Sequence, residues 1–220
     1  IFDFMYKYNQ KVVAFGGGTG AYSWWSGASL LNKPEGNTAI FGTWDSGGSS
    51  GELRVSEGIL PPGDYMQCLV AMMEDMEQKQ EAIIILRDRS FGHPLVNLLG
   101  ALSEKHHHGI SGGIIGLKKL FRVRGKIIPV SLSDIHLCSE TEKGTKILGE
   151  HEIDDIKNNP EFCKKDKISR IYFDIKPDIN SEVISQIKQA DKIVVPPGSP
   201  FTSIFPHLLI PKMSESILLS

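Results

Sequence analysis

The sequence predicts an α/β fold with a doubly wound, mainly parallel sheet and helices on both faces. Three observations carry this prediction. Short apolar segments alternate with helical patterns along the chain, most of these segments are apolar almost throughout, and a run of glycines follows the first of them. Strands that are apolar on both sides must be covered on both faces, as in a parallel sheet whose crossover connections are helices.

Six segments have the length and composition of strands. Each is a short apolar run, and most are rich in β-branched or aromatic residues. We expect them to build the sheet. They are residues 11–15, 37–44, 81–86, 126–132, 170–175 and 191–198.

Three segments have the pattern of amphipathic helices. They are residues 63–80, 95–105 and 181–190. The first carries one apolar stripe at helical spacing, which we expect to pack in the core. The stripe consists of Met66, Leu69, Val70, Met73 and Met76.

Length and composition indicate one domain. With 220 residues, of which 40% are hydrophobic, the chain can bury a full core. We expect residues 11–220 to form a single α/β domain and residues 1–10 to form a flanking segment. Residues 133–167 are more polar and contain a turn at Lys143 and Gly144, so we expect a hairpin excursion from the sheet there.

Charge and cysteine usage exclude several protein classes. The net charge is −2 and no long basic block occurs, which speaks against binding to nucleic acid or to an anionic membrane. Cys68, Cys138 and Cys163 share no C-x-x-C spacing, which argues against a disulfide framework and a structural zinc site. The absence of a long apolar run or signal-peptide pattern favours the cytoplasm. A small molecule is the expected partner, and self-association stays open.

The first predicted strand ends in a glycine-rich turn that suits a phosphate. Gly16, Gly18 and Ala21 satisfy the pattern G-x-G-x-x-A between a strand and a helix. Backbone N–H groups of such a turn, together with the following helix N-terminus, can hold an anion. We therefore predict that residues 16–20 bind a phosphate. A side chain introduced at Gly17 should occupy the space of this phosphate. A tight turn without a ligand is the alternative. The predicted phosphate residues are Gly16, Gly17, Gly18, Thr19 and Gly20.

A second glycine-rich loop follows the second predicted strand. Asp45 stands at the end of this strand, where it could hold a ribose hydroxyl or a metal ion. Behind it, Gly47, Gly48, Ser49 and Ser50 offer backbone donors and hydroxyls to phosphate oxygens. Because parallel strands carry their carboxyl-end loops to one edge, both loops should face one crevice.

Three polar residues stand near predicted helix starts. Asp64 either caps the helix at 63–80 or contributes to the ligand site. His93 precedes the helix at 95–105 and Asn97 lies one turn later, so both are predicted to point to one spot.

The last predicted strand is followed by a third loop of the same kind. After a tight Pro-Gly turn, Gly198, Ser199, Thr202 and Ser203 offer N–H groups and hydroxyls to an anion. This loop should lie at the same edge as the first two. Together the three loops predict a nucleotide-binding domain.

Five motifs, in order, resemble one family. They are GGGTG at Gly16, DSGGSSGELR at Asp45, GILPPGD at Gly58, GHPLVNLLGAL at Gly92 and PPGSPFTSIFPHLL at Pro196. The chain from about residue 11 to about residue 210 is similar to the family of gluconeogenesis factors (YvcK, UDP-sugar-binding) and phospholactate transferases (CofD). The motifs SGELR and ILPPGD favour the gluconeogenesis-factor branch.

The resemblance implies a Rossmann-like sheet whose glycine loops hold a nucleotide diphosphate. By position, Asp45 matches the first acid of the family's Asp-Asp-Gly-Gly loop, and His93 and Asn97 match its Gly-His and Asn-Leu pairs. Ser199, Thr202 and Ser203 match its last loop.

This chain departs from the family pattern at three places. Ser46 replaces the second aspartate, which removes one carboxylate that could bind a metal or accept a proton. The stretch AYSWWSGAS replaces a first helix that is rich in leucine and arginine. The family's domain also continues beyond residue 220, so the chain is expected to be a fragment of such a domain or to build its pocket differently.

Three functions follow from the resemblance and the motifs. The first is a nucleotide-sugar (UDP-sugar) binding protein that regulates carbon metabolism and cell morphology without turnover. The second is a phospholactate-type transferase with a GDP- or GMP-linked donor, in which Mg²⁺ near Asp45 and Asp64 neutralises the diphosphate. The third is an NAD-binding oxidoreductase, which only the first loop supports. Catalytic residues stay unassigned, with Asp45 and Asp64 as candidates and Asp45 as the candidate metal ligand.

Overall fold

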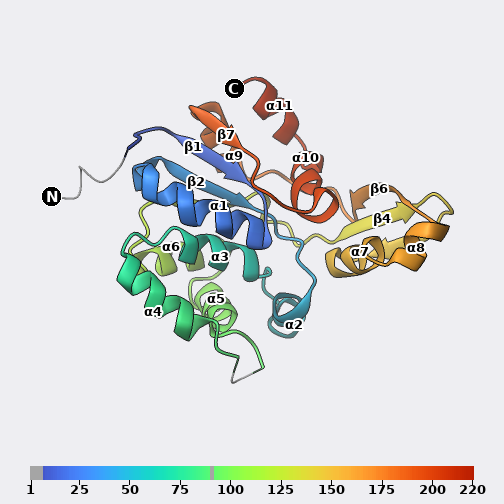
Figure 1. Cartoon of the computed structure of the whole chain (residues 1–220), viewed down its shortest axis with the longest axis horizontal. Coiled ribbons are helices and arrows are strands. Elements are labelled where there is room, and N and C mark those ends of the chain that lie inside the picture. Colours follow the sequence, from blue (N-terminus) through green and yellow to red (C-terminus); the bar gives the residue numbers. More distant parts are fainter. Residues whose placement is uncertain (1–6, 90–91) are drawn as a thin grey trace.

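A four-stranded parallel sheet forms the centre of the molecule. The computed structural model describes residues 7–89 and 92–220 of the chain, so most of the predicted flanking segment lies outside the described residues. The strand order is β3–β2–β1–β7 (Figure 1). All three strand pairings are parallel, which confirms the predicted α/β fold. The strands are β1 (Val12–Phe15), β2 (Asn37–Phe41), β3 (Lys126–Pro129) and β7 (Lys192–Val194).

The inner strand β1 shows why the sheet strands are apolar throughout. All four of its residues are buried. Successive side chains of a strand point to opposite faces, so Ala14 joins the core cluster on one face while Val13 and Phe15 join the cluster on the other. Both faces are therefore covered, as the sequence predicts.

Helices α1 (Gly18–Leu31), α3 (Gly63–Ala71) and α6 (Ile110–Leu120) cover the face of the sheet that carries Ala14. The side chain of Trp25 on α1 is 1% exposed and lies in this core cluster. Outside these helices lie α2 (Gly48–Glu57), α4 (Met76–Leu86) and α5 (Leu95–His106) (Figure 1). Within the described residues, no helix has both the length and the apolar character needed to cross a membrane.

The opposite face of the sheet is covered by α9 (Ser181–Lys188) and α11 (Met213–Leu218). Val183, Ile187 and Met213 are completely buried in the core cluster of this face. Three short elements complete the connections of the sheet. They are the 3₁₀ turn η2 (Pro34–Gly36), the π-helical turn η3 (Pro200–Ile204) and α10 (Phe205–Leu209).

A second, antiparallel sheet projects from the carboxyl side of the first one (Figure 1). Its strand order is β5–β4–β6, and β4 and β5 form a hairpin whose turn contains Lys143 and Gly144. Two helices accompany this sheet. The elements are β4 (Leu137–Thr141), β5 (Lys146–Leu148), α7 (Glu150–Lys157), α8 (Pro160–Lys165) and β6 (Ile168–Phe173). We call residues 137–173 the excursion.

The prediction of a strand at residues 81–86 is wrong, because these residues form the second half of α4. Asp75 caps this helix by accepting a hydrogen bond of 3.0 Å from the backbone N–H of Gln78. Ile84 and Ile85 are 69% and 56% exposed, so the apolar run does not mark a buried strand. A run this short does not distinguish strand from helix by periodicity.

The prediction of one helix over residues 63–80 is also wrong. α3 ends at Ala71, and α4 begins at Met76 after a short irregular segment. The apolar stripe from Met66 to Met73 is buried as predicted, whereas Met76 is 44% exposed. The stripe therefore ends with the first helix.

The segment at 170–175 is a strand, but it does not join the parallel sheet. β6 pairs with β4 in antiparallel register, with Cys138 opposite Tyr172. The excursion therefore continues beyond residue 167 to the end of β6.

Replacement of Leu69 by alanine should destabilise the fold. Leu69 is completely buried in α3, and removal of such a side chain costs about 2–5 kcal/mol through lost burial and the cavity that remains. Leu69→Ala should thus lower the free energy of unfolding by that amount in urea titrations. Leu102→Ala is the matched control, because Leu102 on α5 is 55% exposed and its truncation should have little effect. Equal losses in both variants would contradict the assignment of the core.

Candidate functional site

The three glycine-bearing loops meet at the carboxyl edge of the parallel sheet. The first and third loops are in contact, since a β-carbon at Gly20 would lie 1.6 Å from the carbonyl oxygen of Pro197. The second loop packs against the start of α3, since a β-carbon at Gly63 would lie 2.4 Å from the hydroxyl oxygen of Ser50. Glycine is required at both positions by close approach of the loops.

Two cavities adjoin at this edge and share Asp45 and Gln67 in their walls. The smaller one has a volume of about 150 Å³ and takes residues from all three loops, from α3 and from the excursion. Its walls consist of Gly18, Trp44, Asp45, Asp64, Gln67, Glu150, Thr202 and Ser203. We call it the carboxylate cavity.

The larger cavity has a volume of about 450 Å³ and lies between α1, α3, α4 and the start of α5. Its walls combine apolar, aromatic and cationic side chains. They include Thr19, Tyr22, Ser50, Met66, Arg87, Arg89 and Asn97. We call it the α3–α4 cavity.

Asp64 lies in the carboxylate cavity and holds the first glycine turn. Its carboxylate accepts a hydrogen bond of 2.7 Å from the backbone N–H of Gly18. Burial and, to a smaller extent, the negative charge of Asp45 raise the pKa of Asp64, the hydrogen bond from Gly18 opposes both effects, and the resulting pKa is about 7. The sequence left two roles open for Asp64, as a cap of the helix at 63–80 or as a residue of the ligand site. The backbone N–H group that donates to Asp64 belongs to the first loop.

Asp45 faces Asp64 from the end of β2. Its carboxylate accepts a hydrogen bond of 2.9 Å from the backbone N–H of Gly47. Burial raises the pKa of Asp45, while the hydrogen bonds from Gly47 and Ser50 and the positive charge of Arg54 lower it. The two candidate acids of the sequence therefore lie together in one buried environment.

Glu150 is a third acid of this site, and the sequence analysis missed it. It stands in the first turn of α7, directly after Gly149, whose φ of 110° few other residues adopt. Burial raises the pKa of Glu150 to about 8, and the charges of Asp45, Asp154 and Asp64 add to this shift. The segment GEHEIDD shows an acidic helix start, but no sequence signal places the excursion over the glycine loops.

The three acids do not form a ready-made metal centre. Across residues 7–89 and 92–220, no group of three or more His, Cys, Asp or Glu side chains has an arrangement that could hold a metal ion. Their oxygen atoms are nevertheless the ligand type that Mg²⁺ prefers, and protein sites for Mg²⁺ usually supply one or two carboxylates and leave the remaining positions to phosphate and water.

His93 and Asn97 meet at the second loop, as their spacing predicts. The Nδ1 atom of His93 lies 2.9 Å from the hydroxyl oxygen of Ser49, and the amide of Asn97 donates to the same oxygen at 3.1 Å. The Asn97 amide also lies 3.4 Å from the hydroxyl oxygen of Ser50. Ser50 and Asn97 line the α3–α4 cavity, whereas Ser49 and His93 form the layer behind it.

The third loop is held by α7 of the excursion. Ser199 accepts a hydrogen bond of 2.6 Å from the ammonium group of Lys157, and its hydroxyl oxygen also caps Thr202 N–H at 3.2 Å. The hydroxyl of Thr202 donates to Asp154 at 3.0 Å, and Trp44 Nε1 donates to the Thr202 carbonyl at 2.8 Å. Thr202 and Ser203 therefore reach the carboxylate cavity, while Gly198 and Ser199 serve the turn itself.

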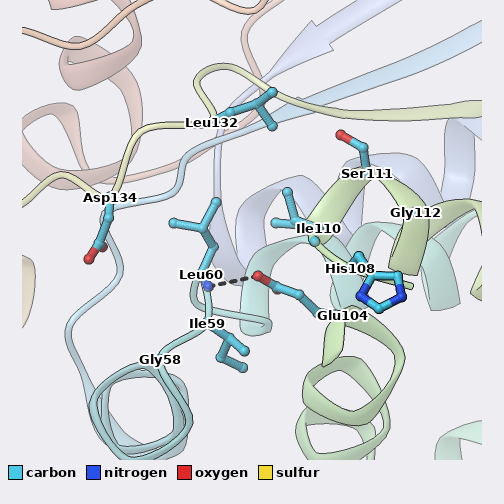
Figure 2. A pocket seen from close by; sticks show the side chains of 11 residues that line it. Gly58, Ile59, Leu60, Glu104, His108, Ile110, Ser111, Gly112, Leu132 and Asp134 are labelled. Carbon is cyan, nitrogen blue, oxygen red and sulfur yellow. Dashed lines mark hydrogen bonds between the residues drawn. The ribbon is translucent and has the colours of Figure 1, made fainter. Parts of the chain in front are cut away.

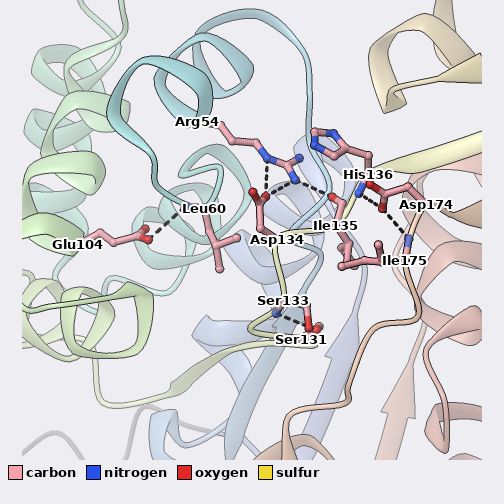
Figure 3. Close-up of polar contacts among 10 residues, drawn as sticks. All are labelled: Arg54, Leu60, Glu104, Ser131, Ser133, Asp134, Ile135, His136, Asp174 and Ile175. Carbon is pink, nitrogen blue, oxygen red and sulfur yellow. Dashed lines mark hydrogen bonds and ion pairs between the residues drawn. The ribbon is translucent and has the colours of Figure 1, made fainter.

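Arg54 ties α2 to the base of the excursion (Figure 3). Its side chain is buried, with Nε donating to Asp134 at 2.9 Å and Nη2 donating to the carbonyl of Ile135 at 2.7 Å. At the next residue, His136 N–H donates to Asp174 at 2.8 Å, which fixes the far end of β6. The arginine of the motif SGELR thus positions the second loop relative to the excursion.

The remaining residues that were predicted to bind phosphate shape the loops and do not line the carboxylate cavity. Gly48 adopts a φ of 46° and has open space around its α-carbon. A β-carbon at Gly16 would make ordinary contact with Pro196, at 3.6 Å, and one at Gly47 would lie 3.3 Å from His151. At Gly17 a β-carbon would lie 2.4 Å from the Asp64 carboxylate, so a side chain there would displace Asp64. The predicted contact of Gly17 with a phosphate stays a prediction.

Ser46, which stands where the family has a second aspartate, faces the excursion. Its hydroxyl oxygen accepts a hydrogen bond of 3.1 Å from the backbone N–H of His151 on α7. Ser46 lines neither of the two cavities.

Comparisons with known proteins identify relatives of the whole chain. Residues 12–220 match the family model of 2-phospho-L-lactate transferase CofD. The gluconeogenesis factor of Halalkalibacterium halodurans is 39% identical over 215 residues, which are 94% of this chain and 63% of that protein. The gluconeogenesis factor of Bacillus subtilis is 35% identical over 213 residues, with shares of 94% and 64%.

A crystal structure of a Bacillus halodurans protein has the same fold. It aligns with a TM-score of 0.83 at 36% identity, covering 96% of this chain and 66% of that one. The chain thus spans slightly less than two-thirds of the length of these relatives.

The stability of the protein without ligand should fall as pH rises. Burial raises the pKa of Asp64 to about 7 and that of Glu150 to about 8, while such groups titrate near 4 in an unfolded chain. Between these values the folded state binds more protons than the unfolded state, so rising pH favours unfolding. The stabilisation by these protons is complete below about pH 4 and is lost as pH rises through about 7 and 8. Urea titrations at several pH values, without divalent cations, measure this slope.

Asp64→Asn should flatten this pH dependence, because it removes one of the groups that take up protons on folding. Asp178→Asn is the matched control, since Asp178 is exposed. A stability that does not change between about pH 5 and about pH 8 in the unaltered chain would contradict the burial of these carboxylates.

Proposed function

This chain belongs to the family of the 2-phospho-L-lactate transferase CofD, and from this premise we propose that it binds a nucleotide diphosphate sugar of the UDP-sugar type. The observation that carries the proposal is the meeting of three glycine-bearing loops at two adjoining cavities. One cavity has the polar walls that a diphosphate needs, and the other has the size and the aromatic and cationic groups that suit the rest of a nucleotide.

The diphosphate belongs in the carboxylate cavity. The N-terminus of α1 begins at Gly18, and helix N-termini favour anions through their free N–H groups and their dipole. The hydroxyls of Thr202 and Ser203 and the amide of Gln67 add neutral hydrogen-bonding groups. Three carboxylates in the same walls would repel an anion, so the diphosphate must enter with compensating positive charge.

A divalent cation such as Mg²⁺ supplies this charge. Asp45 and Asp64 are the residues that would hold it, because both are half-buried, both line the same cavity and the pKa of each is raised by its removal from solvent. When bound, the cation would neutralise the phosphate oxygens and the carboxylates together. Glu150 approaches from α7 and adds a further oxygen donor at the edge of this group.

The base and ribose belong in the α3–α4 cavity. At about 450 Å³ it falls within the range of about 300–1,000 Å³ that is typical of small-molecule sites. The guanidinium carbon of Arg87 lies 5.5 Å from the ring centroid of Tyr22, and both groups line this cavity. Met66 supplies an apolar floor, and Arg89 is a second cation for the phosphate side.

A role in sensing rather than turnover is the form of this function that we favour. Relatives at 35% and 39% identity are named gluconeogenesis factors, which supports a role in the regulation of carbon metabolism. The effect on cell morphology rests on the resemblance of the sequence motifs alone. Ser46 supports the same view, since its hydroxyl binds the backbone of α7 where the family's second aspartate would stand.

A transferase of the phospholactate type is the second candidate. One observation favours it: Asp45 and Asp64, the pair that such chemistry would use to hold Mg²⁺, lie in the same cavity. In that reaction the two carboxylates would hold the cation at the diphosphate. The incoming hydroxyl would form a bond to the phosphorus distal to the nucleoside, the bond from that phosphorus to the nucleoside monophosphate would break, and the hydroxyl proton would pass to solvent.

Calorimetry with UDP-N-acetylglucosamine, GDP and NAD, each with and without Mg²⁺, distinguishes these functions. We expect UDP-N-acetylglucosamine to bind only with Mg²⁺ and to remain intact after incubation. Tight Mg²⁺-dependent binding of GDP instead would favour the transferase. Binding of NAD alone would contradict both functions.

Replacement of Gly17 by alanine should abolish this nucleotide binding while the chain stays folded. The new methyl group would lie 2.4 Å from the Asp64 carboxylate and would force it away from Gly18 and from the cation position. Gly27→Ala is the matched control, because Gly27 lies within α1 with nothing within 4 Å of its β-carbon position. It should keep the affinity and stabilise α1 by up to about 1 kcal/mol. Unchanged affinity in folded Gly17→Ala would contradict the role of Asp64.

A further inference from the structure

A third cavity, with a volume of about 380 Å³, lies apart from the nucleotide site (Figure 2). None of its wall residues lines the carboxylate cavity or the α3–α4 cavity. It is bounded by the loop between α2 and α3, the end of α5, the start of α6 and the loop after β3. We call it the α5–α6 cavity.

Glu104 is a wall residue of this cavity, and one oxygen of its carboxylate is buried without a partner among the described residues. The side chain stands near the end of α5 and is 7% exposed. One oxygen, Oε1, accepts a hydrogen bond of 3.1 Å from the backbone N–H of Leu60 (Figures 2 and 3). The other, Oε2, is buried and has no hydrogen-bond partner among the described residues. A buried acceptor in this state is costly, so Glu104 points to a donor that the protein does not supply.

The first turn of α6 presents the opposite polarity to the same cavity. The helix begins after Gly109, which adopts a φ of 126°. No side chain caps the N-terminus of the helix within the described residues. The backbone N–H groups of Ile110, Ser111 and Gly112 stand in the first turn, where a helix provides no acceptors. These groups carry the partial positive charge of the helix N-terminus, which favours an anion.

Apolar side chains form the remaining walls. Leu60 and Ile110 are buried, and Leu132 lies across the cavity from them and is 56% exposed (Figure 2). Asp134, at the edge, is 69% exposed and its Oδ1 is paired with Arg54 (Figure 3). The inner walls therefore offer the Glu104 carboxylate, one set of N–H donors and one apolar surface, with His108 and Asp134 as further polar wall residues.

We propose that the α5–α6 cavity binds an α-amino acid with an apolar side chain. The Glu104 side chain turns its buried Oε2 toward the cavity and accepts a hydrogen bond from the ligand ammonium group. The ligand carboxylate accepts from the N–H groups of Ser111 and Gly112, and the ligand side chain packs against Leu60 and Leu132. A simple anion would be repelled by Glu104, and a simple cation would be repelled by the helix N-terminus. A zwitterion whose ammonium and carboxylate groups are bonded to the same carbon satisfies both groups.

The size and the electrostatics of the cavity agree with this ligand. A volume of about 380 Å³ is at the lower end of small-molecule sites, as a compact metabolite requires. Burial raises the pKa of Glu104, and a ligand ammonium beside Oε2 would offset the cost of keeping this carboxylate charged. The proposal does not depend on the nucleotide site, because no residue is shared between them.

Calorimetry of the 220-residue chain with L-leucine, in the absence of nucleotide, tests the proposal. We expect saturable binding of one leucine per chain at ligand concentrations up to about 10 mM, a range that covers weak metabolite sites. 3-Methylbutylamine, which lacks the carboxylate, and 4-methylpentanoate, which lacks the ammonium group, should not bind in this range.

Two substitutions remove one polarity each. Glu104→Gln keeps an acceptor for Leu60 but loses the charge, and Ser111→Asp adds a carboxylate that suits a helix start but repels the ligand carboxylate. Each should weaken leucine binding about tenfold or more, a change of about 1.4 kcal/mol or more. Ser181→Asp, in the first turn of α9, is the matched control and should leave the affinity unchanged. Circular dichroism verifies that each variant is folded.

Three results would overturn the proposal. The first is absence of saturable leucine binding to the unaltered chain. The second is binding of 3-methylbutylamine or 4-methylpentanoate with the same affinity as leucine, which would show that the site does not require a zwitterion. The third is full affinity for leucine in folded Ser111→Asp. This result would count even if Glu104→Gln failed to fold.

Discussion

The hydrogen bond from the backbone of Gly18 to the buried carboxylate of Asp64 is the contact on which the arrangement of the site depends. It joins the turn after the first strand to the start of α3. Gly17 lies against the same carboxylate, and a second contact, of Gly63 with Ser50, joins the start of α3 to the second loop. Three segments that are distant in sequence are thereby held at one edge of the sheet.

This arrangement concentrates negative charge where an anionic ligand is proposed to bind. Asp45, Asp64 and Glu150 are each buried enough to raise their pKa. In the free protein the negative charges of these carboxylates repel one another, and protonation reduces this repulsion. With a cation and a diphosphate present, the same carboxylates become ligands. Nucleotide and cation should therefore bind cooperatively, since each lowers the electrostatic cost that the other meets alone.

The sequence predicted the parts of the fold that depend on local pattern. The parallel strands and the glycine turns after them follow from apolar runs and backbone requirements, and the pairing of His93 with Asn97 follows from helix geometry. The helical run at residues 81–86 was not predicted, because its isoleucines form a short apolar run in either structure. The position of Glu150 in the site and the existence of the α5–α6 cavity depend on how distant segments pack together. The periodicity of a single sequence does not show this packing.

The position of Glu150 on α7 has a consequence for divergence within the family. The excursion is an inserted unit with its own sheet, yet it supplies an acid to the cavity and fixes Ser199 through Lys157. Exchange of this unit between relatives would alter the walls of the pocket in one genetic event, while the glycine turns proposed to hold the diphosphate stayed as they are. On this proposal, selectivity and anchoring would be encoded in separable stretches of the gene.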